Sequence, residues 1–159
     1  MKGEYTIDIE RPRADVFAFL SDQQNMQRVE PTLIGFGVLH ETPEKVGSTF
    51  WLVYQENDRT TSMSGVVTAH EHPENLAIRL DHALFSYEAA YHLAEIDAHT
   101  TRLVFSSRER FKHVYKLIGV FAGRRLKAES QSTHQETFAR IKDLIESERE
   151  SEAPASTGE

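Results

Sequence analysis

The feature that most constrains the fold of this chain is a series of short connections between residues 33 and 111. Six segments there alternate apolar and polar residues as half-buried strands do, at about 33–42, 48–57, 60–72, 75–82, 85–96 and 101–111. Turn-forming residues such as Asn57 and Asp58 separate them. Since parallel strands need a crossover of about a dozen residues or more, connections this short predict an antiparallel meander.

The residues before the meander predict a seventh strand and two helices. Residues 2–10 alternate in the same way, and this first strand must join the meander at an edge or close it. Pro12 suits the first turn of a helix, and a second helix is expected to run to Val29, because Pro31 disfavours helix at the residue before it. We therefore expect a two-helix hairpin between strands one and two.

After residue 111 the apolar period changes to steps of three and four residues. No proline interrupts residues 112–151, so the pattern predicts one helix of about 35 residues. Its middle, residues 129–136, carries no bulky apolar side chain. Such a helix cannot fill the concave face of a strongly twisted sheet. The expected fold is α+β, a seven-stranded antiparallel sheet wrapped around a long C-terminal helix, with a cavity between them.

Strand alternation also predicts which side chains face that cavity. Ile34, Val67 and Ala69 belong to the expected inner sets, and on 48–57 we favour the face with Phe50, Leu52 and Tyr54 over Trp51 and Val53. Buried tyrosines and a buried glutamate need partners, so a ligand or water is expected there, unless the tyrosines reach backbone groups or the rim. The candidate ligand-binding residues are Phe36, Phe50, Tyr54, Met63, Tyr87, Tyr91, Phe105, Ser107, Glu109 and, on the long helix, Phe121.

Composition bounds the organisation and the partners. The 159 residues suit one domain, expected over 1–146, followed by a disordered acidic tail over 147–159. The net charge of −7 argues against nucleic acid as a partner, and no apolar run is long enough for a membrane span. The first residues lack the apolar stretch of a secretory signal, so a cytoplasmic location is expected. The absence of cysteine excludes disulfides and thiol chemistry.

Few residues suggest chemistry. His70 and His72 lie two apart on one strand face, but their even positions place them on the outer face and no third ligand is evident, so we expect neither a metal nor another cofactor. Glu109 is the best candidate for a catalytic residue, because an apolar pocket would raise the pKa of its carboxyl group towards neutrality. The alternative is a rim glutamate that is hydrated or paired with Arg108 or Arg110.

Sparse motifs spread along about residues 3–146 indicate a resemblance to a known family. They are Pro12 with Val16, Phe17, Leu20 and Asp22, then Pro31, Gly47, Pro73, Thr101 to Leu103, and the closing Phe138, Ile141, Lys142, Leu144 and Glu146. In order and spacing, the chain resembles the START-like or Bet v 1-like (SRPBCC) superfamily and its bacterial polyketide cyclase/dehydrase-like branch. Val29 departs from the tryptophan of many relatives, and Thr100 from the usual glycine.

The resemblance implies a helix-grip fold with an apolar cavity, but no fixed chemistry. Our first hypothesis is a binding protein rather than an enzyme, one that holds a small hydrophobic or aromatic molecule such as a lipid or a polyketide-like metabolite. The second is an aromatase/cyclase that uses Glu109 with Tyr54, Tyr87 or Tyr91. The third is a protein-interaction module that uses the open sheet edge or the helix surface, and a homodimer is possible.

Overall fold

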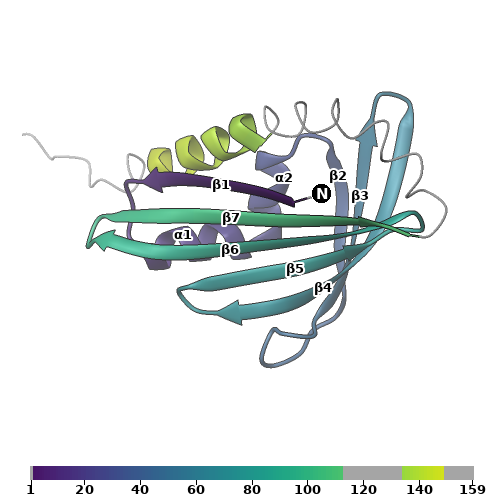
Figure 1. The fold of residues 1–159 in the computed structure, drawn as a ribbon, viewed down its shortest axis with the longest axis horizontal. Coiled ribbons are helices and arrows are strands. Elements are labelled where there is room, and N and C mark those ends of the chain that lie inside the picture. The colour runs from purple at the N-terminus through teal and green to yellow at the C-terminus, as the bar shows by residue number, and fades with distance from the viewer. Residues whose placement is uncertain (1, 113–133, 149–159) are drawn as a thin grey trace, which may run out of the picture.

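A computed structural model describes residues 2–112 and 134–148 of the chain. Seven strands and two short helices precede a C-terminal helix over residues 134–148 (Figure 1). In chain order the elements are β1 (Lys2–Ile9), α1 (Arg13–Ser21), α2 (Gln23–Val29), β2 (Leu33–His40), β3 (Thr49–Glu56), β4 (Arg59–Glu71), β5 (Asn75–Asp81), β6 (Phe85–Asp97) and β7 (Thr100–Phe111).

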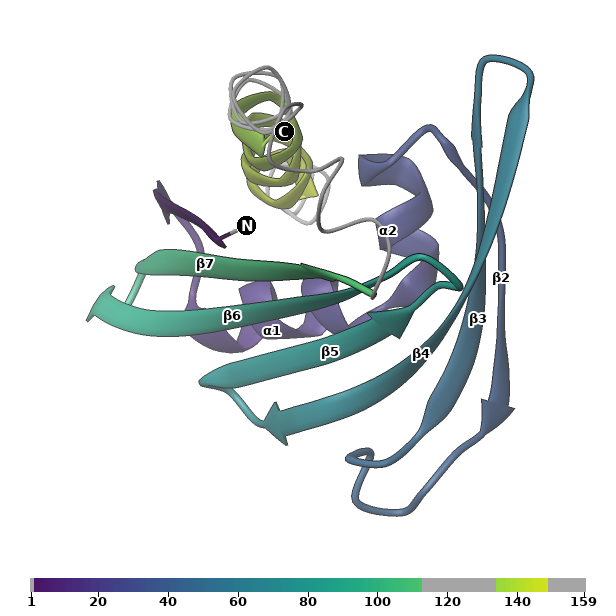
Figure 2. The same cartoon turned by 45° about the vertical axis from the view of Figure 1, so that its right-hand side comes forward.

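The sheet has the predicted antiparallel meander. Its strand order is β1-β7-β6-β5-β4-β3-β2, and every neighbouring pair is antiparallel. β1 joins beside β7 at an edge and does not close the sheet, so β1 and β2 are the two edge strands. The sheet bends sharply, and β2 and β3 stand as a wall across the direction of the other strands (Figure 2). This bend makes one face of the sheet concave.

The predicted helical hairpin between β1 and β2 is confirmed. Asp22 separates the two helices, and its side chain accepts a hydrogen bond of 2.9 Å from the backbone N–H of Gln24, which caps α2. α1 buries Val16 and Phe17 against the core. The hairpin thereby covers part of the concave face with apolar side chains.

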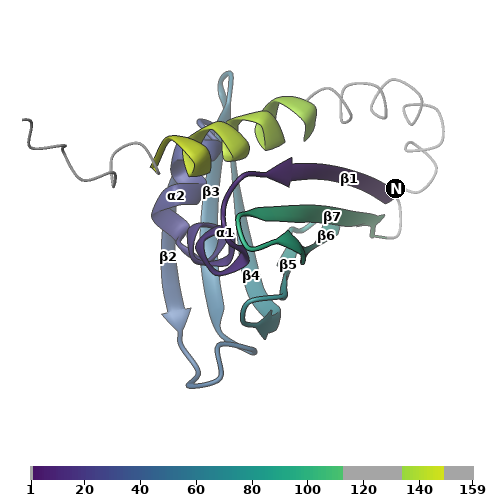
Figure 3. The same cartoon turned by 90° about the vertical axis from the view of Figure 1, so that its left-hand side faces the viewer.

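The C-terminal helix lies on the same side of the sheet as α1 and α2 (Figure 3). Phe138, Ile141 and Ile145 are almost fully buried and belong to one core cluster with Leu103 and Phe105 of β7. Residues 113–133, which include Phe121, lie outside the described residues, so the predicted length of this helix is not tested. Residues 149–159 of the predicted tail lie outside them as well. No helix in the described ranges 2–112 and 134–148 is both long and apolar enough to cross a membrane.

Two β-bulges overturn part of the predicted facing. The register shifts between Leu33 and Gly35 on β2, and Ile34 is half exposed instead of inward. It shifts again between Val67 and Ala69 on β4, where Ala69 pairs with Ala77 on the outer face. One extra residue reverses the face of every residue that follows it.

The bulge on β4 also turns two histidines inward. The rings of His70 and His72 contact the ring of Phe17 edge-on, with centroids 5.2 and 4.9 Å apart. The prediction that both face outward was therefore wrong, because strict alternation does not continue through a bulge.

Candidate functional site

A cavity of about 280 Å³ lies between the concave face of the sheet and the helices. The strands supply most of its wall, because their alternate side chains point to this face. Residues of the hairpin helices and of the C-terminal helix line it from the other side. Its apolar lining includes Leu20, Met26, Val29, Leu33, Phe36, Phe50, Leu52, Val67, Leu76, Ile78, Leu80, Phe105, Phe138 and Ile141.

Aromatic rings form one wall of the cavity. Phe105 of β7 is their centre, with ring centroids 5.2 Å from Tyr91, 5.4 Å from His134 and 4.9 Å from Phe138. Tilted rings at these separations attract one another beyond the burial of their surface. Burial lowers the pKa of His134, which favours its neutral form. This wall offers flat, apolar surface to a bound molecule.

Three tyrosines place phenol groups in the same cavity. Tyr54 of β3, Tyr87 of β6 and Tyr91 of β6 all line it. Burial raises the pKa of Tyr54 to about 12, and a nearby carboxylate and the Tyr87 phenol add to the shift. Burial also raises the pKa values of Tyr87 and Tyr91. The phenols therefore stay neutral at physiological pH and can donate or accept hydrogen bonds.

The carboxylate that acts on all three phenols belongs to Glu30, a residue that the sequence analysis missed. Glu30 lines the cavity from the end of α2. Its backbone N–H donates a hydrogen bond of 2.8 Å to the Met26 carbonyl, and its own carbonyl accepts one of 2.9 Å from Leu33. Pro31 stops the helix here, and the turn that follows fixes Glu30 at the entrance to β2.

Burial raises the pKa of the Glu30 carboxyl group, the charge of Glu56 adds to this, and the positive charge of Arg140 opposes it. The Arg140 guanidinium donates a hydrogen bond to the Val29 carbonyl and so ties the C-terminal helix to the end of α2. Within residues 2–112 and 134–148, the Glu30 carboxylate forms no hydrogen bond or ion pair. It is a charged group in an apolar cavity without a direct protein partner there.

The structure brings six of the ten predicted ligand-binding residues to the cavity wall: Phe36, Phe50, Tyr54, Tyr87, Tyr91 and Phe105. Met63, Ser107 and Glu109 face inward but do not line it. Met63 packs beside the smaller core cluster, and Ser107 lies near Tyr87 and opposes the rise in the pKa of its phenol. Glu109 lies opposite Tyr87, with the pKa of its carboxyl group raised by burial. The role of all ten residues in binding stays a prediction, and Phe121 is outside the described residues.

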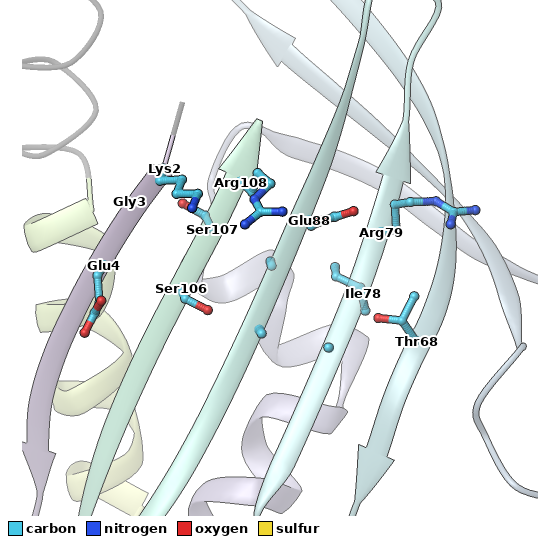
Figure 4. Close-up of a pocket in the computed structure, with 13 residues that line it drawn as sticks. Lys2, Gly3, Glu4, Thr68, Ile78, Arg79, Glu88, Ser106, Ser107 and Arg108 are labelled. Atoms are coloured by element: carbon cyan, nitrogen blue, oxygen red, sulfur yellow. The ribbon is translucent and has the colours of Figure 1, made fainter. Parts of the chain in front are cut away.

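The outer face of the sheet carries a different depression, of about 570 Å³ (Figure 4). Lys2, Arg108, Glu88 and Arg79 lie there on neighbouring strands in one cross-strand row, with Ser106 and Thr68 beside them. The described residues contain no group of three or more His, Asp or Glu side chains placed to hold a metal ion. Because its lining is mostly apolar with a few polar groups, the inner cavity is the better candidate for a site that holds an organic molecule.

Residues 1–146 match the model of a family described as polyketide cyclase/dehydrase and lipid transport. The match covers the whole described fold except the last two residues of the C-terminal helix. The chain belongs to this family. The predicted resemblance to the START-like and Bet v 1-like proteins is confirmed at that level. A search of curated proteins gave no match.

Solved structures with the same fold include members of this superfamily. The Zhui aromatase/cyclase from a Streptomyces species is 15% identical, with a TM-score of 0.76 and 98% of each chain covered. A conserved protein from Geobacillus kaustophilus is 14% identical, with a TM-score of 0.72, 91% of this chain and 95% of that chain covered. A START superfamily protein from Mycobacterium smegmatis is 14% identical, with a TM-score of 0.65, 90% of this chain and 98% of that chain covered. At these identities the likeness concerns the fold alone.

Proposed function

We propose that this protein binds a small hydrophobic or aromatic molecule in the inner cavity. The observation that carries the proposal is an apolar, aromatic cavity that also contains phenol and carboxyl groups without hydrogen bonds. Within the described residues the hydroxyls of Tyr54 and Tyr91 form none, like the Glu30 carboxylate. Because these groups line the cavity and are open to it, a ligand or ordered water can complete their hydrogen bonds.

The size of the cavity limits the ligand. At about 280 Å³ it falls near the lower end of the range for ligand pockets, roughly 300–1,000 Å³. A compact molecule of two or three rings, or a short branched chain, fits this space better than an intact two-chain lipid. The family includes lipid-transport proteins, which supports an apolar ligand.

Native mass spectrometry of the purified protein, followed by analysis of an organic extract, tests the proposal. We expect a bound apolar molecule that is absent from a variant whose cavity is filled, Ala89→Phe. Ala89 lines the cavity, and a ring at this position occupies the space of the ligand. The matched control is Ala90→Phe on the outer face of the same strand. Equal ligand content in both variants would contradict the proposal.

A second candidate is an aromatase/cyclase activity, which the fold of the Streptomyces aromatase/cyclase and the carboxyl group beside three phenols favour. Glu30, which lines the cavity, is better placed than Glu109 to exchange protons with a molecule inside it. A synthetic poly-β-ketone thioester is the test substrate. Cyclisation by aldol addition and loss of one water gives a lighter aromatic product. No turnover above that of buffer would exclude this candidate for that substrate.

A further inference from the structure

The charges around the inner cavity set the chemical class of its ligand. Among the cavity-lining residues within 2–112 and 134–148 there is no lysine or arginine, and Glu30 is the only aspartate or glutamate. A carboxylate in a cavity of low polarity repels a second anion much more strongly than it does in water. The described part of the lining, whose other titratable groups are three tyrosines and the imidazoles of His70 and His134, therefore distinguishes molecules by the charge of their head group.

The charged groups near Glu30 do not cancel its negative charge. Among the described residues, Arg140 is the cation whose charge acts on Glu30, but its guanidinium donates to the Val29 carbonyl and forms no ion pair with Glu30. Glu56 adds a second negative charge near the same point. The local balance of Glu30, Glu56 and Arg140 is thus one net negative charge.

The cavity wall also carries tyrosine hydroxyls, which can form hydrogen bonds with a ligand. Tyr54, Tyr87 and Tyr91 line the same cavity as Glu30, and the charge of Glu30 adds to the raised pKa of each phenol. The aromatic wall around Phe105 gives the remaining surface. The cavity has a polar part that accepts hydrogen bonds and an apolar part that accepts rings.

We infer that the cavity selects a neutral or cationic ligand with a hydrogen-bond donor, such as a phenol, an alcohol or an amine on an apolar skeleton, and rejects carboxylates. The donor bonds to the Glu30 carboxylate, and the skeleton packs on the aromatic wall. Free fatty acids and other carboxylic acids are excluded as ligands. This inference rests on the proposed binding function and names the ligand class for the same site.

Four probes with one naphthalene skeleton test the inference by isothermal titration calorimetry at pH 8, where 2-naphthoate is ionised. They are 2-naphthol, 2-methoxynaphthalene, 2-naphthylmethylamine and 2-naphthoate. We expect 2-naphthol and the amine to bind the wild-type protein at least about tenfold more tightly than 2-naphthoate, a difference of about 1.4 kcal/mol. The methoxy compound, which lacks the donor, should bind more weakly than 2-naphthol.

The variant Glu30→Gln removes the charge and keeps an acceptor. We expect it to reduce the preference for the amine over 2-naphthoate by about tenfold and to change the affinity for 2-naphthol little. Glu88→Gln, on the outer face, is the matched control and should keep the wild-type ratios. Wild-type protein that binds 2-naphthoate as tightly as 2-naphthol, or an unchanged ratio in Glu30→Gln, would overturn the inference while the binding function stands. If none of the four probes binds, the proposed function falls as well.

Discussion

The inner and outer faces of this sheet are built on the same strands but treat charge in opposite ways. Ala77, Ile78 and Ala89 contribute to the walls of both depressions. On the outer face, charged side chains form ion pairs in solvent, as Arg102 and Asp8 do at 2.8 Å and Arg79 and Asp81 at 3.1 Å. Exposed pairs of this kind contribute little to folding stability.

The inner face carries one lining carboxylate, in apolar surroundings and without a direct partner among the described residues. A group placed in this way makes the free protein less stable unless something satisfies it. The outer charges are hydrated and paired, whereas Glu30 needs a functional explanation. Three pairs of variants, with one residue from each face, test this contrast.

The two faces should differ most in the free energy of unfolding that is lost when a β7 side chain is truncated. Leu103 is 0% exposed, and Leu103→Ala should lower the free energy of unfolding by about 2–5 kcal/mol through lost burial and a new cavity. Ser106, on the outer face of the same strand, is exposed, and Ser106→Ala should stay within about 0.5 kcal/mol of wild type. Urea denaturation followed by circular dichroism measures both. Similar losses would mean that the two faces do not differ in packing as described.

A smaller difference in stability between the two faces is expected at two glycines, each of which lets an aromatic ring approach the backbone. A Cβ at Gly65 would lie 2.3 Å from the ring of Phe50, which lines the cavity, and one at Gly37 would lie 2.5 Å from Nε1 of Trp51. Trp51 is 39% exposed and can swing into solvent, whereas the Phe50 ring must move into the cavity or its neighbours. Gly65→Ala should therefore cost about 1–3 kcal/mol and weaken ligand binding.

The outer member of this pair is Gly37→Ala, which should cost less and leave ligand binding unchanged. Trp51 is the only tryptophan in the chain, so its fluorescence reports the displacement directly. We expect a red shift of its emission in Gly37→Ala and not in Gly65→Ala. Weaker binding in Gly37→Ala would show that the outer face is coupled to the cavity.

Most of the fold could be predicted from local patterns in the sequence. The short connections fix the antiparallel meander, and Pro12, Asp22 and Pro31 fix the helical hairpin. The choice of Phe50, Leu52 and Tyr54 as the inner face of β3 is confirmed, because Phe50 and Leu52 are buried and Tyr54 lines the cavity. Each of these features depends on residues that are close in sequence.

Features that depend on distant residues could not be predicted in the same way. The bulge between Val67 and Ala69 depends on how β4 pairs with β5, and it reversed the predicted facing of His70. Glu30 reaches the cavity because the turn after α2 places it in the same wall as Tyr54 and Tyr87, and no periodic pattern marks it. Its place directly before Pro31, at the end of the hairpin, was the only local indication.

The smallest expected difference between the two faces is in how stability depends on pH. Raising the pH should remove stability at Glu30 and add stability at Asp8. Burial raises the pKa of Glu30, so above about pH 4.5 the folded protein holds its proton more tightly than the unfolded chain does. The stability that this group contributes is therefore full below about pH 4.5 and is lost as the pH rises through the higher pKa of the folded state. On the outer face, the hydrogen bond from Arg102 lowers the pKa of Asp8 below its ordinary value of 3.8. Stability from Asp8 is present above that value and is lost as the pH falls below it.

Urea denaturation between pH 2 and 7 of wild type, Glu30→Gln and Asp8→Asn separates the two effects. Relative to wild type, Glu30→Gln should gain stability from pH 4 to pH 7, because it removes a charge that burial disfavours. Asp8→Asn should be less stable than wild type at pH 7, and this deficit should shrink below about pH 3.8. Added salt should reduce the Asp8 effect, since exposed charges are screened, and the Glu30 effect much less. A constant difference between Glu30→Gln and wild type across this range would mean that the carboxyl group is solvated, and the contrast between the two faces would then be lost.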